Sequence, residues 1–537
     1  MDLRAKIGQL IVVRASGYLS DRQRRYPQWE ADNQTLESWL RDLNLGGVIL
    51  LGASATEIKT RTKLLQSWAK TPLLVAADIE AGVGQRFSGK TWFPPPMALA
   101  AIAQKDLTQA QKYAYQMGAV TAQEALAIGI NWLLAPVVDV NNNPDNPVIN
   151  IRAFGESPEI VSALTKAFIA GAQTTQIVTT AKHFPGHGDT ATDSHLDLPI
   201  IQHDRDRLEK VELPPFQSAI ETGVDSIMTA HLTVPTWDKH KPATLSRSIL
   251  TGVLREQLGF SGLIVTDALI MGGITKYSDP ETVAVMAIDA GVDILLMPEN
   301  PKTAIEAIYQ AVTQGKISED RIEESYQRVQ TLKNKVNPDQ ISQTIPSNIP
   351  TKTKKSHNSA SLVLDGYRVA EQIVKDSLAV TGNLPLEVSN PQECRNLIVV
   401  DDVLSANYLD LATPAIAVPQ SLGYQRQIID SHSLSLINQD SRPTLLQLFI
   451  RGNPFRGSAG LTPEAQQQYQ QLLDSDRLIG LVIYGSPYVR AWFESQIAPE
   501  IPFIFSYGQM DIAQGVALKN LFTSVEDPRK RPDNFGF

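Results

Sequence analysis

The 537-residue sequence has very little cysteine: Cys394 is the only one, so no disulfide can form within the chain. That composition is typical of a reducing compartment. The sequence also lacks a run of the roughly 20 apolar residues that a membrane-spanning helix needs, so we expect no membrane span. Acidic residues outnumber basic ones: the chain has 57 Asp and Glu but 48 Lys and Arg, which gives a formal net charge of -9. Non-specific nucleic-acid binding needs a basic surface, so no nucleic-acid partner is expected.

The start of the chain lacks the pattern of a secretory signal. Its apolar stretch Ile7–Val13 is too short for an h-region followed by a small-residue cleavage site. We interpret this stretch as a first strand and predict a cytoplasmic protein. The chain is long enough for two or three domains.

From residue 7 to about residue 300, short apolar runs alternate with longer amphipathic ones. The eight predicted strands are Ile7–Val13, Gly47–Leu51, Leu73–Asp78, Trp132–Asp139, Ile177–Ala181, Asp225–Thr229, Leu263–Asp267 and Asp293–Met297. Helical patterns lie between most of them, and two more follow the last strand. This alternation indicates a parallel sheet with right-handed crossovers, and eight repeats over this length favour a (β/α)8 TIM-like barrel. An open doubly wound sheet is the alternative.

The composition changes after the barrel pattern ends. Residues 337–360 are rich in Pro, Ser, Thr, Asn and Lys, which is typical of an exposed linker. We therefore predict a barrel domain over residues 1–336 and a second domain over residues 361–537. The second is again α/β, with predicted strands that include Pro414–Val418, and we expect a C-terminal α/β/α sandwich. Its least ordinary features are Arg451 and the turn Gly485-Ser486-Pro487, for which capping and turn roles are the simpler interpretation.

The densest polar cluster of the chain is the segment AKHFPGHGDTATDSH at residues 181–195, which holds three of the eight histidines. It directly follows the apolar run 177–180, so it is predicted to leave the end of a buried strand. In a barrel, functional groups gather at the C-terminal ends of the strands. The polar residues expected at those ends are Asp78, Glu80, Asp139, Lys182, His183, His231 and Asp267.

Asp267 and the pair Asp193 and His195 suggest specific chemistry. Asp267 ends an apolar strand and can be either a rigidly held nucleophile or the N-cap of the next helix. Asp193 and His195 are two residues apart, so in an extended segment they face the same side. The carboxylate would then fix the histidine tautomer and produce a general acid and base. A solvated pair is the alternative.

The remaining candidates suit the hydroxyl groups of a sugar. Lys182, His183, Arg152 and Asp78 mix cations with a carboxylate, and each hydroxyl both donates and accepts hydrogen bonds. A Zn²⁺ site in the histidine-rich loop is disfavoured, because the spacings match no known short motif and Lys182 would repel the metal. We therefore predict no metal and no cofactor. A Schiff-base role for Lys182, as in an aldolase, fits its context less well.

Several blocks together resemble the β-N-acetylglucosaminidases of glycoside hydrolase family 3. The most specific is KHFPGHGDT at residues 182–190, followed by DSH at residues 193–195. Further similar blocks are APVVDV at 135–140, RAFG at 152–155, IMTAH at 227–231 and FSGLIVTDAL at 260–269. The resemblance is strong over residues 1–335 and much weaker beyond.

The resemblance implies a hydrolase that retains anomeric configuration and acts on terminal non-reducing N-acetylglucosamine. It implies Asp267 as the nucleophile, with His195 as acid and base paired to Asp193. The residues that it implies for substrate binding are Asp78, Arg86, Arg152, Lys182, His183 and His231. The implied partner is a small carbohydrate, an N-acetylglucosamine-containing cell-wall fragment in peptidoglycan recycling. The C-terminal domain is expected to have an accessory or packing role.

The sequence departs from the family at one block. Ala81 and Val83 replace a glycine and an arginine that the family has there, so contacts near Val83 are uncertain. Three alternatives remain open at this stage. They are a β-glucosidase of the same family, a phosphorylase that uses phosphate in place of water, and an inactive sugar-binding protein.

Overall fold

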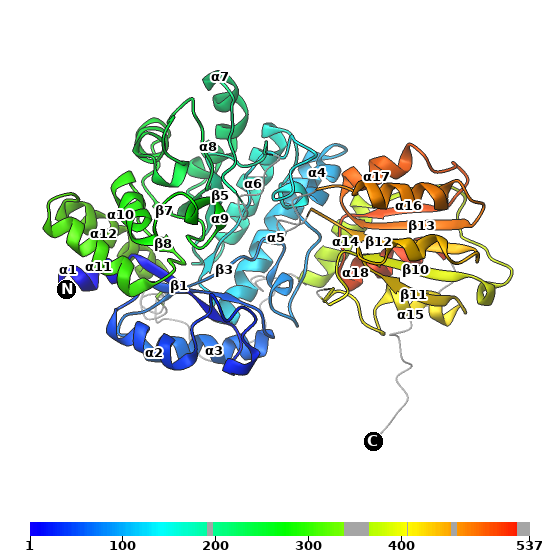
Figure 1. Cartoon of the computed structure of the whole chain (residues 1–537), viewed down its shortest axis with the longest axis horizontal. Helices are drawn as coiled ribbons and strands as arrows, with labels where there is room; N and C mark the ends of the chain where they lie inside the picture. The colour runs from blue at the N-terminus through cyan, green and yellow to red at the C-terminus, as the bar shows by residue number, and fades with distance from the viewer. Residues whose placement is uncertain (191–196, 338–364, 405, 453–458, 523–537) are drawn as a thin grey trace, which may run out of the picture.

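The structure is a computed structural model, which describes residues 1–190, 197–337, 365–404, 406–452 and 459–522. The chain folds into two α/β units, coloured blue to green and yellow to red in Figure 1. Of the predicted linker 337–360, only Asn337 belongs to the described residues, so the predicted domain boundaries stay predictions. In the described part of the chain, no helix is both long enough and apolar enough to cross a membrane.

The N-terminal unit is the predicted barrel of eight parallel strands. Its strands are β1 (Ile11–Ser16), β2 (Gly47–Leu51), β3 (Leu74–Ala77), β4 (Trp132–Leu133), β5 (Thr180–Phe184), β6 (Ser226–Thr229), β7 (Leu263–Val265) and β8 (Leu295–Leu296). The hydrogen-bonded orders are β4-β3-β2-β1-β8 and β5-β6-β7. Parallel bridges Trp132↔Val178 and Val265↔Ile294 join the two sheets, so the barrel closes. The open-sheet alternative is wrong.

Helices surround this barrel. They are α1 (Leu3–Gly8), η1 (Asp21–Gln23), α2 (Asn33–Asp42), α3 (Ala55–Trp68), η2 (Val83–Gln85), α4 (Met97–Ala103), α5 (Leu107–Ala127), η3 (Asn150–Arg152), α6 (Pro158–Ala172), α7 (Arg205–Arg207), η4 (Leu208–Glu212), α8 (Leu213–Glu221), η5 (Ala243–Leu245), η6 (Ser248–Gln257), α9 (Gly272–Thr275), α10 (Pro280–Ala290), α11 (Pro301–Thr313) and α12 (Glu319–Lys335). Several begin with a side-chain cap followed by proline. Ser157 accepts from Ile160 N before α6, and Asp279 accepts from Thr282 N before α10. Such caps satisfy amide groups that the first turn leaves unpaired.

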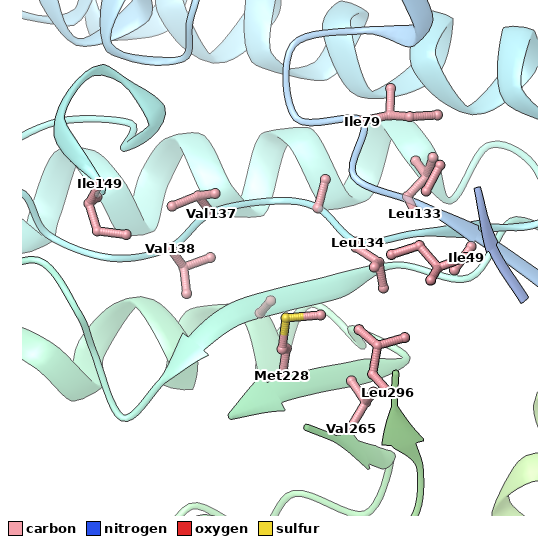
Figure 2. Close-up of a cluster of buried hydrophobic side chains, with 14 of the residues drawn as sticks. Ile49, Ile79, Leu133, Leu134, Val137, Val138, Ile149, Met228, Val265 and Leu296 are labelled. Atoms are coloured by element: carbon pink, nitrogen blue, oxygen red, sulfur yellow. The ribbon is translucent and has the colours of Figure 1, made fainter. Parts of the chain in front are cut away.

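Apolar side chains fill the interior of the barrel. Figure 2 shows Ile49 of β2, Met228 of β6, Val265 of β7 and Leu296 of β8 converging on Leu134. All are buried, with at most 7% of their surface exposed. The barrel is therefore a packed core rather than a pore, and polar groups are confined to its ends.

The C-terminal unit is a six-stranded sheet between two layers of helices. Its strands are β9 (Ala379–Thr381), β10 (Arg395–Val400), β11 (Gln425–Ile429), β12 (Thr444–Ile450), β13 (Leu478–Gly485) and β14 (Phe503–Ser506). Its helices are α14 (Gly366–Ser377), η7 (Pro391–Glu393), α15 (Pro414–Ser421), η8 (Leu434–Asn438), α16 (Pro463–Leu473), α17 (Pro487–Glu494) and α18 (Asp511–Leu521). The order is β11-β10-β12-β13-β14-β9, and only the β9 pairing is antiparallel.

Apolar residues on both faces of the central strands explain why helices cover the C-terminal sheet on both sides. Leu397 and Val399 of β10 join the apolar cluster that contains residues of α16 and α17. Ile398 and Val400 join the other cluster, with residues of α15 and α18. Successive strand residues point to opposite faces, so each face of this sheet needs a helical cover. The predicted α/β/α sandwich is confirmed.

Two predicted strands contain residues that are helical in the structure. Within Ile7–Val13, the first residues belong to α1, because Asp2 accepts from Ala5 N at 2.8 Å and caps a helix there. The segment Pro414–Val418 lies in α15, which Pro414 begins and whose apolar residues pack on the sheet. A short apolar run has no periodicity that separates a buried strand from a buried helix.

A buried lysine lies beneath the barrel, where α12 crosses its N-terminal end. Lys333 is 4% exposed, and its Nζ donates to Gln9 Oε1 at 2.6 Å. Burial lowers the pKa of Lys333 from 10.5 to about 7. Since the folded pKa lies below the unfolded one, the unfolded chain binds more protons between these values. This group therefore makes stability rise as pH increases from about 7 towards 10.

We expect Lys333→Met to raise the free energy of unfolding at pH 6.5 by on the order of 3 kcal/mol, because no charge is then buried. The variant should also lose part of the rise in stability between pH 7 and pH 9. Urea unfolding at pH 6.5, 7 and 9 measures the free energy of unfolding of both proteins. Lys316→Met, at an exposed lysine, is the control. A Lys333→Met variant less stable than wild type at pH 6.5 would contradict the expectation.

Candidate active site

A cavity of about 1060 Å³ lies at the C-terminal ends of the barrel strands. Residues that follow β3, β4, β5 and β7 line it, and side chains of the C-terminal domain line its other wall. The lining residues that the sequence predicted as site residues are Asp78, Arg86, Arg152, Lys182, His183 and Asp267. The barrel thus brings together groups that are up to 189 positions apart in the sequence.

Glu80 is the centre of an ion-pair network at the floor of the cavity. Arg152 donates to both its carboxylate oxygens, at 2.9 and 2.8 Å, and Lys182 Nζ lies 2.6 Å from Oε1. Lys182 also donates to Asp78 Oδ1 at 2.7 Å. Burial alone would raise the pKa of Glu80, but the two cations outweigh it and hold the pKa well below the usual range. The network therefore keeps Glu80 ionised and holds Asp78, Arg152 and Lys182 around it in a fixed arrangement.

Asp139 organises the start of the histidine-rich loop. Its carboxylate bonds His183 Nδ1 at 2.8 Å and accepts from His187 N at 2.6 Å. Burial opposes ionisation, but the adjacent His183 lowers the pKa of Asp139, so the carboxylate stays charged. Burial lowers the pKa of His187 to about 4, which keeps its ring neutral at pH 7. Asn146 also fixes the backbone of this loop, because its Nδ2 donates to His187 O at 2.8 Å and to Gly188 O at 2.9 Å.

Asp267 lies two residues beyond β7 and is partly exposed to the cavity. Its Oδ1 accepts from Ala268 N at 2.8 Å, and its own N donates to Thr229 O at 3.2 Å. These bonds fix the backbone on both sides of the carboxylate. No regular helix begins directly after it, since α9 starts at Gly272 with Met271 as N-cap. The N-cap interpretation of Asp267 is therefore wrong.

His231 lies behind the lining of the cavity. Its ring is fully buried and does not line the cavity. Nδ1 bonds Thr244 Oγ1 at 2.8 Å, and Nε2 lies 3.1 Å from Ala268 O. The ring thus supports the backbone next to Asp267. Direct substrate binding by His231, which the resemblance implies, stays a prediction.

Asp193 and His195 lie outside the described residues, so their geometry is not part of the site described here. Among the described residues on either side of them in the sequence, Asp189 Oδ2 bonds His203 Nε2 at 2.8 Å and lies 3.4 Å from Arg207 Nη2. Among the described residues, no group of three or more His, Cys, Asp or Glu side chains is arranged to hold a metal ion.

The two departures from the family pattern have different surroundings. Val83 is fully buried in the apolar core, and Ala81 is nearly buried at the cavity edge. Arg86, three residues further on, reaches the cavity and donates from Nε to Asp78 O at 3.0 Å. Arg86 therefore contacts Asp78, whereas Val83 belongs to the apolar core.

The C-terminal domain contributes a wall that the sequence interpretation missed. Its residues at the cavity include Asp401, Asp402, Tyr408, Arg451 and Tyr507. Tyr488 of α17 ties the domains together, donating to Glu156 Oε1 at 2.6 Å and accepting from Asn141 Nδ2 at 2.7 Å. Arg451 and the turn Gly485-Ser486-Pro487 were the available signals, but sequence periodicity cannot show how two domains dock. The expected accessory role of the domain stays a prediction.

Both domains of the chain match known proteins. The family model described as "Glycosyl hydrolase family 3 N terminal domain" matches residues 2–332, and the one described as "Bacterial Glycosyl hydrolase family 3 C-terminal domain" matches residues 387–523. Among curated relatives, Beta-hexosaminidase A of Pseudoalteromonas piscicida is 34% identical over 67% of this chain and 62% of its own length. The Beta-hexosaminidase of Alkalilimnicola ehrlichii is 36% identical over 49% of this chain and 76% of its own.

Solved structures extend the similarity to the whole chain. The structure described as a glycoside hydrolase family 3 beta-N-acetylglucosaminidase from Paenibacillus sp. str. FPU-7 superposes with a TM-score of 0.77. It is 28% identical, and the match covers 98% of this chain and 97% of that one. By contrast, the chain spans less than two thirds of the length of the Pseudoalteromonas relative.

Proposed function

Because the chain belongs to glycosyl hydrolase family 3, we propose that it is a retaining exo-β-N-acetylglucosaminidase. It would hydrolyse terminal non-reducing N-acetylglucosamine from small carbohydrates. The names of the hexosaminidase relatives support this activity. The observation that carries the proposal is the cavity itself, in which Asp267 and the Asp78–Lys182–Arg152 set line the same space.

The proposed reaction has two displacements at the anomeric carbon. In the first, an Asp267 oxygen bonds that carbon while the bond to the leaving oxygen breaks, and His195 gives this oxygen a proton. In the second, His195 takes a proton from water, the water oxygen replaces the Asp267 ester, and the carboxylate is restored. Two inversions give net retention. Asp193 would hold the His195 tautomer.

The charged network would bind the sugar ring. Asp78, Lys182 and Arg152 offer one acceptor and two donors in fixed positions, which suits adjacent hydroxyls. His183, oriented by Asp139, would complete the set together with Arg86. Because these groups already contact one another, little reorganisation is needed when a hydroxyl arrives, and the anomeric carbon can be presented to Asp267.

We propose cell-wall fragments as the natural substrates and the cytoplasm as the location, which would suit peptidoglycan recycling. These two statements rest on the family resemblance and on the lack of cysteine pairs in the sequence.

The first test compares p-nitrophenyl β-N-acetylglucosaminide with the corresponding β-glucoside. Wild type is expected to cleave the first substrate faster. His195→Ala should lower its kcat/KM by about 10²-fold, the usual contribution of a general acid and base. p-Nitrophenol is a good leaving group, so the loss should be larger with a disaccharide. Absence of cleavage of both substrates by wild type would contradict the proposal.

Whether water or phosphate takes the sugar from Asp267 in the second displacement is tested by running the same reaction with and without inorganic phosphate. Release of free N-acetylglucosamine in both cases indicates hydrolysis. Formation of the sugar 1-phosphate instead would assign phosphorolysis, in which a phosphate oxygen replaces water in the second displacement.

A further inference from the structure

A side-chain hydrogen bond joins the two flanks of the segment that contains Asp193 and His195. Asp189 precedes these residues in the sequence and His203 follows them, and His203 Nε2 donates to Asp189 Oδ2 at 2.8 Å. The two bonded side chains are 24% and 32% exposed, so the bond is partly shielded from water. Neither residue of this bond lines the cavity, so neither is placed to bind the sugar.

Each flank also has contacts of its own with the barrel. A Cβ on Gly188 would lie 1.8 Å from Val140 O, so the first flank passes directly against the chain that follows β4. On the second flank, Thr233 N donates to Pro199 O and Ile201 N donates to Thr233 O, both at 2.9 Å. Thr233 lies on the chain that follows β6. Loss of the bond between the flanks should therefore leave the fold intact and change how the flanks are placed relative to each other.

Arg207 of α7 and Glu212 of η4 support the bond from behind. Arg207 Nη2 lies 3.4 Å from Asp189 Oδ2 and 3.3 Å from Glu212 Oε1. Glu212 is 4% exposed, and a Cβ on Gly186 would lie 2.9 Å from its Cβ. Because Arg207 also contacts this buried carboxyl group, it holds the Asp189 oxygen in the place where His203 donates to it.

We propose that Asp189 and His203 are positioning residues for the general acid and base. This role rests on the proposed function, in which His195 transfers the proton. A bond between the two flanks restricts the residues between them, because it brings together the ends of the intervening chain. Proton transfer needs the donor within hydrogen-bond reach of the leaving oxygen, and a misplacement of about 1 Å lowers a rate by about 10²-fold. The bond between the flanks thus acts on proton transfer rather than on sugar binding.

The test compares two substrates whose leaving groups differ in their need for a proton. They are 2,4-dinitrophenyl and phenyl β-N-acetylglucosaminide: dinitrophenolate leaves without protonation, whereas phenolate needs the acid. His203→Ala is expected to lower kcat/KM by about tenfold for the phenyl substrate and by less than about twofold for the dinitrophenyl substrate. His203→Gln should recover most of the loss, because its side-chain amide can donate to Asp189 as the ring does.

A double variant tests whether the effect passes through His195. The variant His195→Ala/His203→Ala should cleave the phenyl substrate as slowly as His195→Ala alone, since the position of an absent acid has no effect. Asp189→Asn, at the other end of the bond, should show the same unequal losses to a smaller degree. The matched control is His240→Ala, at an exposed histidine that does not line the cavity, and it should keep the wild-type kcat/KM for both substrates.

Three results would overturn the positioning role. They are equal losses on both substrates in His203→Ala, no loss on either substrate, and a further loss when His203→Ala is added to His195→Ala. Wild-type cleavage of the two substrates is measured first and tests the proposed function separately. If wild type cleaves neither, the proposed function fails. If wild type cleaves both and one of the three results is found, only the positioning role fails.

Discussion

Replacing Asp267 by alanine is expected to lower kcat for p-nitrophenyl β-N-acetylglucosaminide by about 10⁴-fold or more, since losses of that order follow removal of a nucleophile. The fold should survive, because the side chain is partly exposed and accepts a hydrogen bond from the adjacent Ala268 N. Azide is a small anion that can enter the space left by the carboxylate. It should restore p-nitrophenol release in Asp267→Ala and give the α-glycosyl azide, because only one inversion then occurs.

The matched control for this prediction is Asp279→Asn. Asp279 is an exposed N-cap that accepts from Thr282 N at 2.9 Å, and asparagine caps a helix equally well. Its activity should equal that of wild type. Full activity of Asp267→Ala, or a β-configured azide product, would remove Asp267 from the nucleophile role.

The sequence predicted the barrel well because buried parallel strands need continuous apolar runs. β2 occupies the predicted range Gly47–Leu51, and α3 begins at Ala55 behind a serine cap. The rule that parallel strands present their C-terminal ends on one face then placed Asp78, Lys182 and Asp267 in one site. That inference needed only the order of the strands, and no side-chain geometry.

The missed features depend on contacts between distant parts of the chain. Glu80 was predicted only as a polar strand-end residue, but pairing with Arg152 and Lys182 makes it the centre of the network. Arg451 reaches the cavity through docking of a second domain, which no local pattern records. His231 shows the reverse case, since its strand-end position was predicted correctly while its ring turns into the core.

Replacing Glu80 by glutamine should damage both stability and activity, because it leaves Arg152 and the buried Lys182 without their shared carboxylate. We expect the free energy of unfolding at pH 7 to fall by about 3 kcal/mol, in the range for breaking a buried ion pair. We expect kcat/KM to fall by about 10²-fold, because the ring-binding donors are no longer fixed. Glu306→Gln is the control, since its pair with Arg4 is 50% exposed on both sides and surface ion pairs of this kind add little stability.

The pH dependence separates an electrostatic role of Glu80 from simple packing. Its folded pKa is depressed, so the stabilisation is present above the unfolded value of about 4.3 and is lost as pH falls through the folded pKa. Wild type should therefore lose this contribution only under strongly acidic conditions, and Glu80→Gln should lose less stability on acidification below about pH 4. Urea unfolding at pH 7, 5 and 3 measures both slopes. Parallel curves for the two proteins would mean that glutamine replaces the carboxylate in shape alone, and that the charge of Glu80 does not hold the network together.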